Sequence, residues 1–142
     1  MTPVERGAAN PAVPILNAML IADHAIREEG TGKVSLIGIF ESISAATFPC
    51  RHPTLFVYAK MTDAEGTYDF LLELIHLDQA AKIAELGLKV HAPDRMAVGE
   101  LILRLDNLVF PSSGFYEARL LADGRYLGSK TFSVVASSVT GG

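Results

Sequence analysis

The sequence predicts an all-β fold, an antiparallel β-sandwich of roughly seven to nine strands. Three observations lead to this prediction. Apolar and polar residues alternate with a period of two in several short segments, as they do in strands with one buried face. Turn-forming residues separate these segments at nearly regular spacing. Of the 142 residues, 49% are hydrophobic and 20% are charged, which predicts a folded chain with a core of useful size.

The first element is the one segment for which two structures compete. Residues 16–29 (LNAMLIADHAIREE) are rich in alanine, leucine, methionine, arginine and glutamate, so propensity alone predicts a helix. The same residues lead directly into a Gly-Thr-Gly turn at residues 30–32, which also suits a buried strand. The residues themselves therefore leave helix and strand open.

The later elements all show strand patterns. Residues 34–44 (VSLIGIFESIS) are rich in β-branched residues, and residues 55–61 (LFVYAKM) follow two prolines. Alternation with a period of two then recurs at residues 68–74, 83–90, 100–106, 116–121 and 131–134. Asp123-Gly124 separates two of these segments and predicts a tight hairpin, because glycine accepts a positive φ.

The predicted domain occupies residues 15–135, and both ends of the chain lie outside it. Residues 1–14 hold three of the seven prolines and show no periodic pattern, so we predict a flexible N-terminal arm. Residues 136–142 (ASSVTGG) are small and polar, and we predict a flexible C-terminal tail. Neither end has enough apolar surface to offset the entropy lost on ordering.

Charge and cysteine content argue against several functional classes. Twelve lysines and arginines against 16 aspartates and glutamates give a net charge of −4, which argues against a nucleic-acid partner. The longest apolar stretch, residues 12–22, is interrupted by Pro14 and Asn17. It is too short to span a bilayer and makes a poor signal peptide, so no membrane partner is expected. The single cysteine allows no internal disulfide, and we expect a cytoplasmic protein.

The strongest local pattern lies near the end of the chain. Residues 111–117 (PSSGFYE) precede ARLLADGRYLGSKTFSV. A Gly-x-Tyr that enters a strand before an Asp-Gly turn resembles the last hairpin of immunoglobulin-like sandwiches, in which a corner tyrosine bonds a backbone group. The resemblance implies a structural corner at Tyr116, with Gly114, Asp123 and Gly124 shaping the turns. The cysteine pair and core tryptophan of true immunoglobulin domains are absent, since the chain has one Cys and no Trp.

Residues 20–135 as a whole resemble a family of small uncharacterised bacterial proteins, known only as a domain of unknown function. Three segments carry this resemblance: LIADHAIREEGTGKVSLIGIFESI, FPCRHPTLFVYAKM and FYEARLLADGRYLGSKTFSV. The resemblance implies a β-sandwich in which residues 16–26 form a strand rather than a helix. It implies no activity, because the family has none assigned.

Few side chains suggest chemistry. Cys50 and His52 would point to the same face of an extended segment, where they could form half of a metal site or a Cys–His nucleophile. His76 is expected at a strand end with a partly exposed ring, and the other histidines stand alone. Asp69 and Glu73 share a strand face but lie about 13 Å apart, too far for paired acid–base work. We therefore expect no catalytic residue, no metal site and no cofactor.

The excess of apolar residues is more informative. Taken as one strand, residues 34–44 have two apolar faces, one with Val34, Leu36 and Phe40 and the other with Ile37, Ile39 and Ile43. Phe56 and Tyr58 likewise oppose Leu55 and Val57. An antiparallel sandwich strand normally has one polar face, so something must cover the outer one. The cover is the N-terminal arm, a second copy of the chain or another protein, unless loops and arms of the same chain suffice.

We predict a non-catalytic protein-interaction or assembly module that self-associates as a homo-oligomer. Its predicted partner interface consists of Ile37, Ile39, Ile43, Phe56 and Tyr58. One alternative is a sandwich that binds a small ligand such as a carbohydrate through Phe56, Tyr58 and Tyr126, although such sites often use tryptophan and this chain has none. A second alternative is a small enzyme that uses Cys50 and His52, with or without a metal.

Overall fold

The computed structural model describes residues 12–137, in which nine strands form two sheets. The strands are β1 (Ile15–Arg27), β2 (Val34–Ile39), β3 (Ser42–Ala45), β4 (Cys50–Thr62), β5 (Gly66–His76), β6 (Ala81–Ala92), β7 (Gly99–Phe110), β8 (Gly114–Ala122) and β9 (Arg125–Ala136). The four-stranded sheet has the order β2-β1-β4-β7, and the five-stranded sheet has the order β3-β9-β8-β5-β6. Residues 1–11 of the predicted arm and 138–142 of the predicted tail lie outside the described residues.

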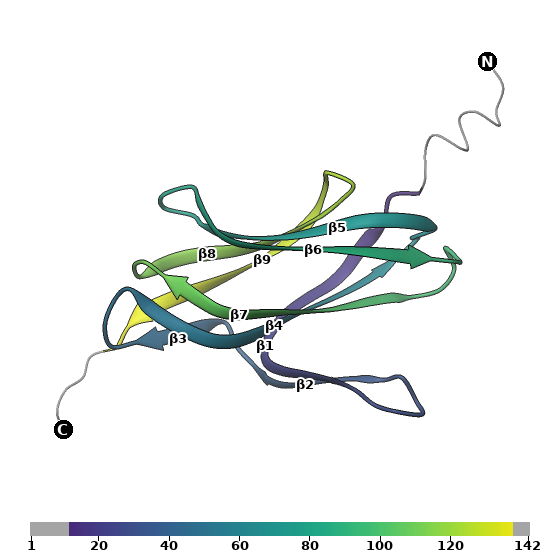
Figure 1. Ribbon diagram of the computed structural model, residues 1–142. Coiled ribbons are helices and arrows are strands. Elements are labelled where there is room, and N and C mark those ends of the chain that lie inside the picture. The colour runs from purple at the N-terminus through teal and green to yellow at the C-terminus, as the bar shows by residue number, and fades with distance from the viewer. Residues whose placement is uncertain (1–11, 138–142) are drawn as a thin grey trace, which may run out of the picture.

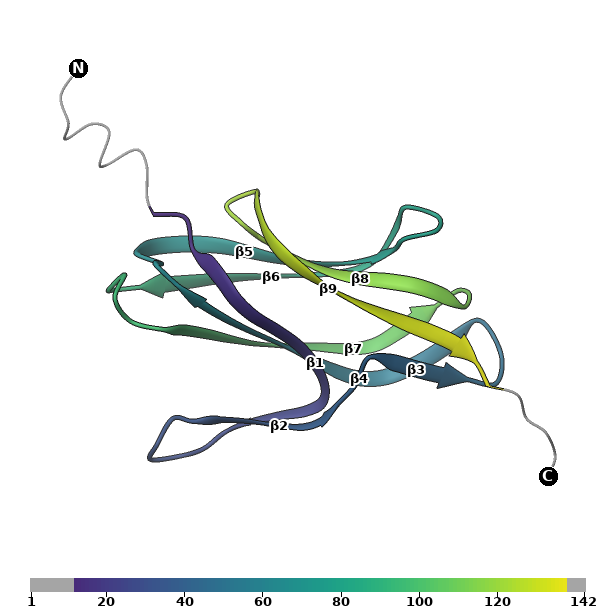
Figure 2. The same cartoon turned by 180° about the vertical axis from the view of Figure 1, so that it is seen from behind.

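The predicted all-β sandwich is confirmed. Figure 1 and Figure 2 show the two sheets as stacked layers, with β5, β6, β8 and β9 in the upper layer and β1, β4 and β7 in the lower one. The core lies between them, where Ile21 and Val57 of one sheet and Leu120 and Val134 of the other are completely buried. Among the strand pairs of residues 12–137, only β3 with β9 is parallel.

The first element is a strand, as the family resemblance implies. β1 pairs with β4 from Ile15–Thr62 to Ala22–Phe56, and it buries Met19 and Ile21 in the core. Helix propensity differs by only about 0.7 kcal/mol or less among ordinary residues, so pairing and burial outweigh it. The helix that propensity alone predicts for residues 16–29 is therefore wrong.

Residues 34–44 form two strands rather than one, which corrects the prediction of a single two-faced strand. β2 pairs with β1 at an edge of the four-stranded sheet, and β3 pairs with β9 at an edge of the five-stranded sheet. Phe40 and Glu41 connect them: the Phe40 amide donates to the Ile21 carbonyl (3.0 Å), and the Glu41 carbonyl accepts from the Ser133 amide (3.0 Å). The apolar residues of this segment thus serve two sheets.

The predicted turn at Asp123-Gly124 joins β8 to β9 in two residues. Both residues have positive φ, 49° and 81°, as a type I′ hairpin turn requires. Asp123 also ties the turn to β5, because its carboxylate accepts from the Asp69 amide (2.8 Å) and its own amide donates to the Asp69 carbonyl (2.9 Å).

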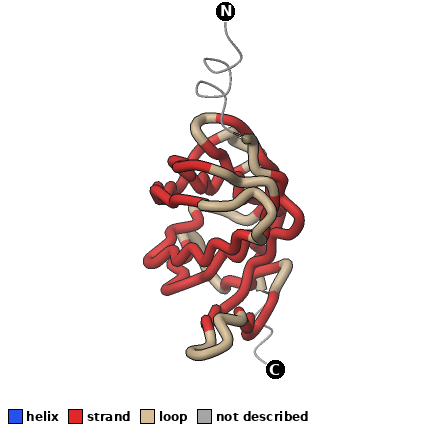
Figure 3. The backbone as a smooth tube through the Cα atoms, turned by 90° about the vertical axis from the view of Figure 1, so that its right-hand side faces the viewer, coloured by secondary structure: helices blue, strands red, loops and turns tan. Residues whose placement is uncertain are grey.

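The β1–β2 hairpin leaves the plane of its sheet. Figure 1 and Figure 2 show it below β4 and β7, on the side away from the five-stranded sheet. Figure 3 shows the described chain from the side, as strands joined by loops. Arg27 at the end of β1 lies 3.7 Å from Glu100 of β7, although β1 pairs with β4 and not with β7. The hairpin therefore covers part of the outer face of the four-stranded sheet.

Candidate interaction surface

The structure separates the five residues of the predicted interface. Ile37 and Ile39 are half-exposed, at 50% and 53%, and Phe56 is partly buried beside them. Ile43 is 8% exposed because β3 turns it into the core, and Tyr58 is 9% exposed beneath the hairpin. This corrects the expectation that Ile43 and Tyr58 line an exposed surface.

Strand pairing explains why the other three residues share a surface. Ile39 lies opposite Ala22, which lies opposite Phe56 on its other side, and Ile37 lies opposite His24. Directly opposed residues project to the same face of a sheet, so these side chains are neighbours. The His24 and Phe56 rings are 6.2 Å apart between centroids.

Ile26 extends this surface along β1. It follows His24 by two residues, which places it on the same strand face, and it is 51% exposed. Sequence reasoning missed Ile26, because its segment also suited a helix and its face could not be assigned. We call the following set the hairpin patch: His24, Ile26, Ile37, Ile39 and Phe56.

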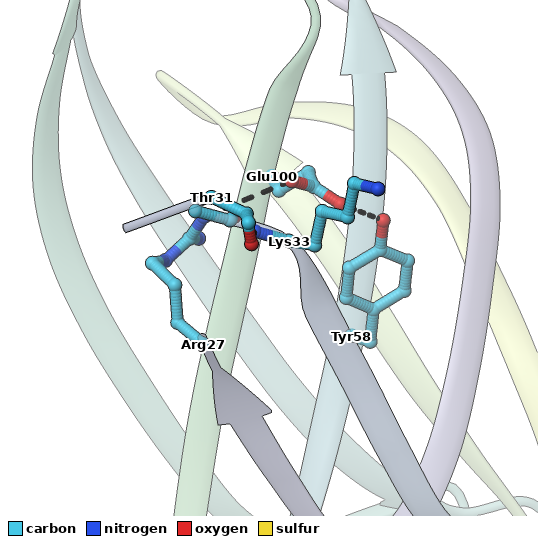
Figure 4. A network of polar contacts seen from close by, with 6 residues as sticks. Arg27, Thr31, Lys33, Tyr58 and Glu100 are labelled. Atoms are coloured by element: carbon cyan, nitrogen blue, oxygen red, sulfur yellow. Dashed lines mark hydrogen bonds and ion pairs between the residues drawn. The ribbon is translucent and has the colours of Figure 1, made fainter. Parts of the chain in front are cut away.

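The hairpin is fastened to the sheet by a polar network around Glu100 (Figure 4). The Tyr58 hydroxyl donates a hydrogen bond to the Glu100 carboxylate, which also forms the ion pair with Arg27. Arg27 donates to the Gly32 carbonyl in the turn (3.0 Å). Burial, together with the Glu100 carboxylate, raises the pKa of Tyr58 to about 12, so its hydroxyl remains a donor at neutral pH.

Tyr116 occupies a corner at the start of β8. Its ring is completely buried, and its hydroxyl donates to the Ser112 carbonyl at 2.6 Å, the backbone bond that defines a tyrosine corner. Gly114 has a φ of +141°, and a Cβ there would lie 2.8 Å from the Asp78 carboxylate. The corner thus depends on a glycine at this position.

Residues 17–135 match the sequence model of a family described as a family of unknown function, DUF6941. The chain belongs to DUF6941. The resemblance to a domain of unknown function is therefore confirmed. An immunoglobulin-like protein from Pseudomonas aeruginosa is similar to this DUF6941 chain with a TM-score of 0.44 and 12% identity, over 88% of this chain and 98% of that one. No curated protein matches the chain.

In this DUF6941 chain, the buried His76 lies next to Ser112. His76 is 1% exposed, which corrects the expected partly exposed ring, and its Nε2 lies 3.0 Å from Ser112 Oγ. The Gln79 amide donates to Nδ1 at 3.3 Å, so the ring is held between Gln79 and Ser112. The pair is part of the Tyr116 corner, because the His76 and Tyr116 rings are 4.5 Å apart between centroids and both side chains contact Ser112.

Cys50 and His52 lie at the start of β4 without forming a recognisable reactive site. Cys50 packs partly buried against the core, and the His52 ring lies 6.2 Å from that of Phe40 and 6.4 Å from that of Phe110. His52 Nε2 is buried and has no hydrogen-bond partner within the described part of the chain. In residues 12–137, no three His, Cys, Asp or Glu side chains gather in a group that could hold a metal ion.

The aromatic residues of the carbohydrate alternative do not converge in the DUF6941 fold. Phe56 and Tyr58 belong to β4 of the four-stranded sheet, and Tyr126 belongs to β9 of the other. An apolar pocket of about 150 Å³ between β6 and β7 is lined by residues that include Phe70 and Leu101. A cavity of this size holds a molecule about as large as benzene. A larger and more open hollow of about 590 Å³ lies beside Phe70 and Lys89, and its lining does not include Phe56, Tyr58 or Tyr126. Within residues 12–137, no helix has the length and apolar character needed to cross a bilayer.

Proposed function

We propose that this chain is a non-catalytic interaction module that associates with a second copy of itself through the hairpin patch. The observation that carries the proposal is the grouping of Ile26, Ile37 and Ile39, each about half-exposed, on one face of a hairpin at a sheet edge. Single exposed apolar residues are common, but large ones gathered on one surface are typical of interaction sites.

The exposed apolar area of the hairpin patch determines how strong the association should be. Full burial of an isoleucine contributes about 1.5–3 kcal/mol, so each half-exposed isoleucine offers about 1 kcal/mol. A symmetric dimer covers the same three residues on both copies and gains about 6 kcal/mol from them. Because association itself costs about 4–15 kcal/mol, we expect a weak dimer that needs further contacts from the backbone.

The non-catalytic part of the proposal rests on the two histidines that come near a possible nucleophile. His76 is 1% exposed and packed within the Tyr116 corner, so a substrate has no access to its ring beside Ser112. His52 lies against two aromatic rings, and its buried Nε2 contacts no group that would orient it as a base. Neither arrangement supports nucleophilic chemistry.

The test is the molar mass in solution as a function of concentration, by light scattering or sedimentation. We expect a mass that rises from one chain toward two chains over the micromolar range, because the patch is small. Ile37→Ser combined with Ile39→Ser should keep the mass at one chain. Leu88→Ser is the matched control, since Leu88 is 39% exposed on β6 of the other sheet, and it should behave as the wild type. A wild-type mass of one chain throughout, or undiminished association of the double variant, would overturn the proposal.

A further inference from the structure

We infer that the pocket between β6 and β7 binds the end of a straight alkyl chain, supplied by a free molecule of the class of fatty alcohols and fatty acids. β6 and β7 are edge strands of different sheets, and they lie on the same side of the sandwich (Figure 1). The site is separate from the hairpin patch, so the inference does not depend on self-association.

The two sides of the sandwich are closed to different degrees. On one side Leu16 of β1 lies directly against Gly128 of β9, where a Cβ would be only 2.5 Å from Leu16 Cδ2. On the other side, an apolar pocket of about 150 Å³ remains between β6 and β7. The chain crosses this side through residues 93–98, which connect the two strands. A ligand can therefore reach the space between the sheets from the β6–β7 side.

The wall of the pocket is mainly aliphatic. Met61 of β4, which is 2% exposed, is its most buried member, and Val90 and Leu101 line it from β6 and β7. Val98 lines it from the connection and is 54% exposed, so the pocket is open to solvent there. Methionine is flexible and polarizable, which suits it to contact with an apolar ligand of variable shape.

The polar side chains near the pocket are engaged elsewhere. His91 Nδ1 lies 3.0 Å from Thr67 Oγ1, and the Asp94 carboxylate accepts from the Met96 amide at 2.9 Å. Glu100 belongs to the network that fastens the hairpin. Burial of apolar surface is therefore the main interaction that the pocket offers to a ligand.

The pocket continues into an apolar strip on β6. Val90, Leu88 and Leu86 are each two residues apart, so their side chains share one face of the strand. They lie opposite three residues that are buried in the core, Tyr68, Phe70 and Leu72. Leu88 nevertheless is 39% exposed, which means that the four-stranded sheet leaves this part of β6 uncovered.

Shape and chemistry together specify the ligand. The pocket takes an apolar body about as wide as benzene, and the strip extends this apolar surface in one direction along β6. A ligand that fills both is narrow, elongated and apolar at its inner end. A straight alkyl chain has this form, with its terminal methyl group near Met61 and its polar head in water.

Titration of the full chain with hexanol, heptanol and octanol tests the inference, because these straight-chain alcohols differ only in chain length. NMR of labelled methionine methyl groups follows binding. The Met61 signal should shift and saturate, whereas the signal of Met19, which does not line the pocket, should stay in place. Each added methylene should lower Kd by about fourfold if it is fully buried.

Ala92→Leu fills the pocket and should weaken octanol binding by about tenfold or more. Ala84→Leu is the matched control. Like Ala92, Ala84 is a partly buried residue of β6 that packs against the core, but it does not line the pocket. It should bind octanol as the wild type does. Circular dichroism confirms that both variants fold.

A saturable Met61 shift that strengthens with chain length and is lost selectively in Ala92→Leu supports the inference. A Met61 signal that no alcohol moves overturns it. Equal affinity for the three alcohols, or equal loss of binding in the two alanine variants, also overturns it. If Ala92→Leu does not fold, the chain-length series and the comparison of Met61 with Met19 decide in the wild type.

Discussion

Removal of the Tyr116 hydroxyl should destabilise the domain, because the hydroxyl is the donor of a buried hydrogen bond. Tyr116→Phe keeps the aromatic ring, which lies 5.0 Å from the Phe110 ring and 5.8 Å from the Phe132 ring between centroids. The substitution therefore removes the 2.6 Å bond to the Ser112 carbonyl while leaving the ring contacts in place. No large cavity forms, and the effect reports on the hydrogen bond.

The expected loss is about 1–3 kcal/mol, the cost of leaving a buried polar group without its partner. For a domain of this size, that corresponds to a fall in Tm of roughly 3–10 °C. Tyr126→Phe is the matched control. Tyr126 is 59% exposed, and its hydroxyl donates to Ser129 Oγ at 3.0 Å, so water can replace the lost bond. Its stability should change by less than about 0.5 kcal/mol.

Urea unfolding followed by far-ultraviolet circular dichroism measures both variants against the wild type. The midpoint should fall for Tyr116→Phe with an unchanged slope, since the surface exposed on unfolding stays the same. Equal losses in the two variants would show that burial does not determine the value of the corner bond. A change of less than about 0.5 kcal/mol in Tyr116→Phe would refute the reasoning altogether.

Three further substitutions test the hairpin and the corner. Arg27→Ala should lower stability by less than about 1 kcal/mol, because the ion pair with Glu100 is partly exposed, but it should speed hydrogen exchange of the β2 amides. The pKa of Tyr58 is raised to about 12, so the stabilising effect of the protonated hydroxyl is complete below pH 10 and is lost as the pH rises through 12. Tyr58→Phe should abolish this part of the pH dependence of unfolding. Gly114→Ala should cost about 1–3 kcal/mol, seen as a lower Tm, because side chains rarely adopt a φ of +141°, and the Asp78 carboxylate must also shift away from the added Cβ.

The fold class could be predicted from the sequence because strand alternation and turn residues are local signals. Tyr68, Phe70, Leu72 and Leu74 alternate with more exposed residues, and all four are buried in the structure. The Asp123-Gly124 turn is also a local signal, because these two adjacent residues adopt both of the positive φ values that the turn requires. Such patterns need no knowledge of which strands pair.

The candidate surface could be predicted only in part, because it depends on pairing between distant residues. Residues 34–44 read as one strand, and nothing in their alternation reveals that the chain changes sheets at Phe40 and Glu41. Ile43 was therefore expected on the surface, whereas the parallel pairing of β3 with β9 buries it. His76 was misjudged for a similar reason, since its partner Ser112 is 36 residues away.

The fold buries part of the apolar excess that the sequence shows and leaves another part exposed. The β1–β2 hairpin covers Tyr58 on the outer face of its sheet, so part of the excess is hidden by the chain itself. A two-stranded ribbon, however, has two faces of its own. In β2, Val34 and Leu36 are partly buried while Ile37 and Ile39 are exposed. Covering one apolar face with this ribbon thus produces a second one, which carries the hairpin patch.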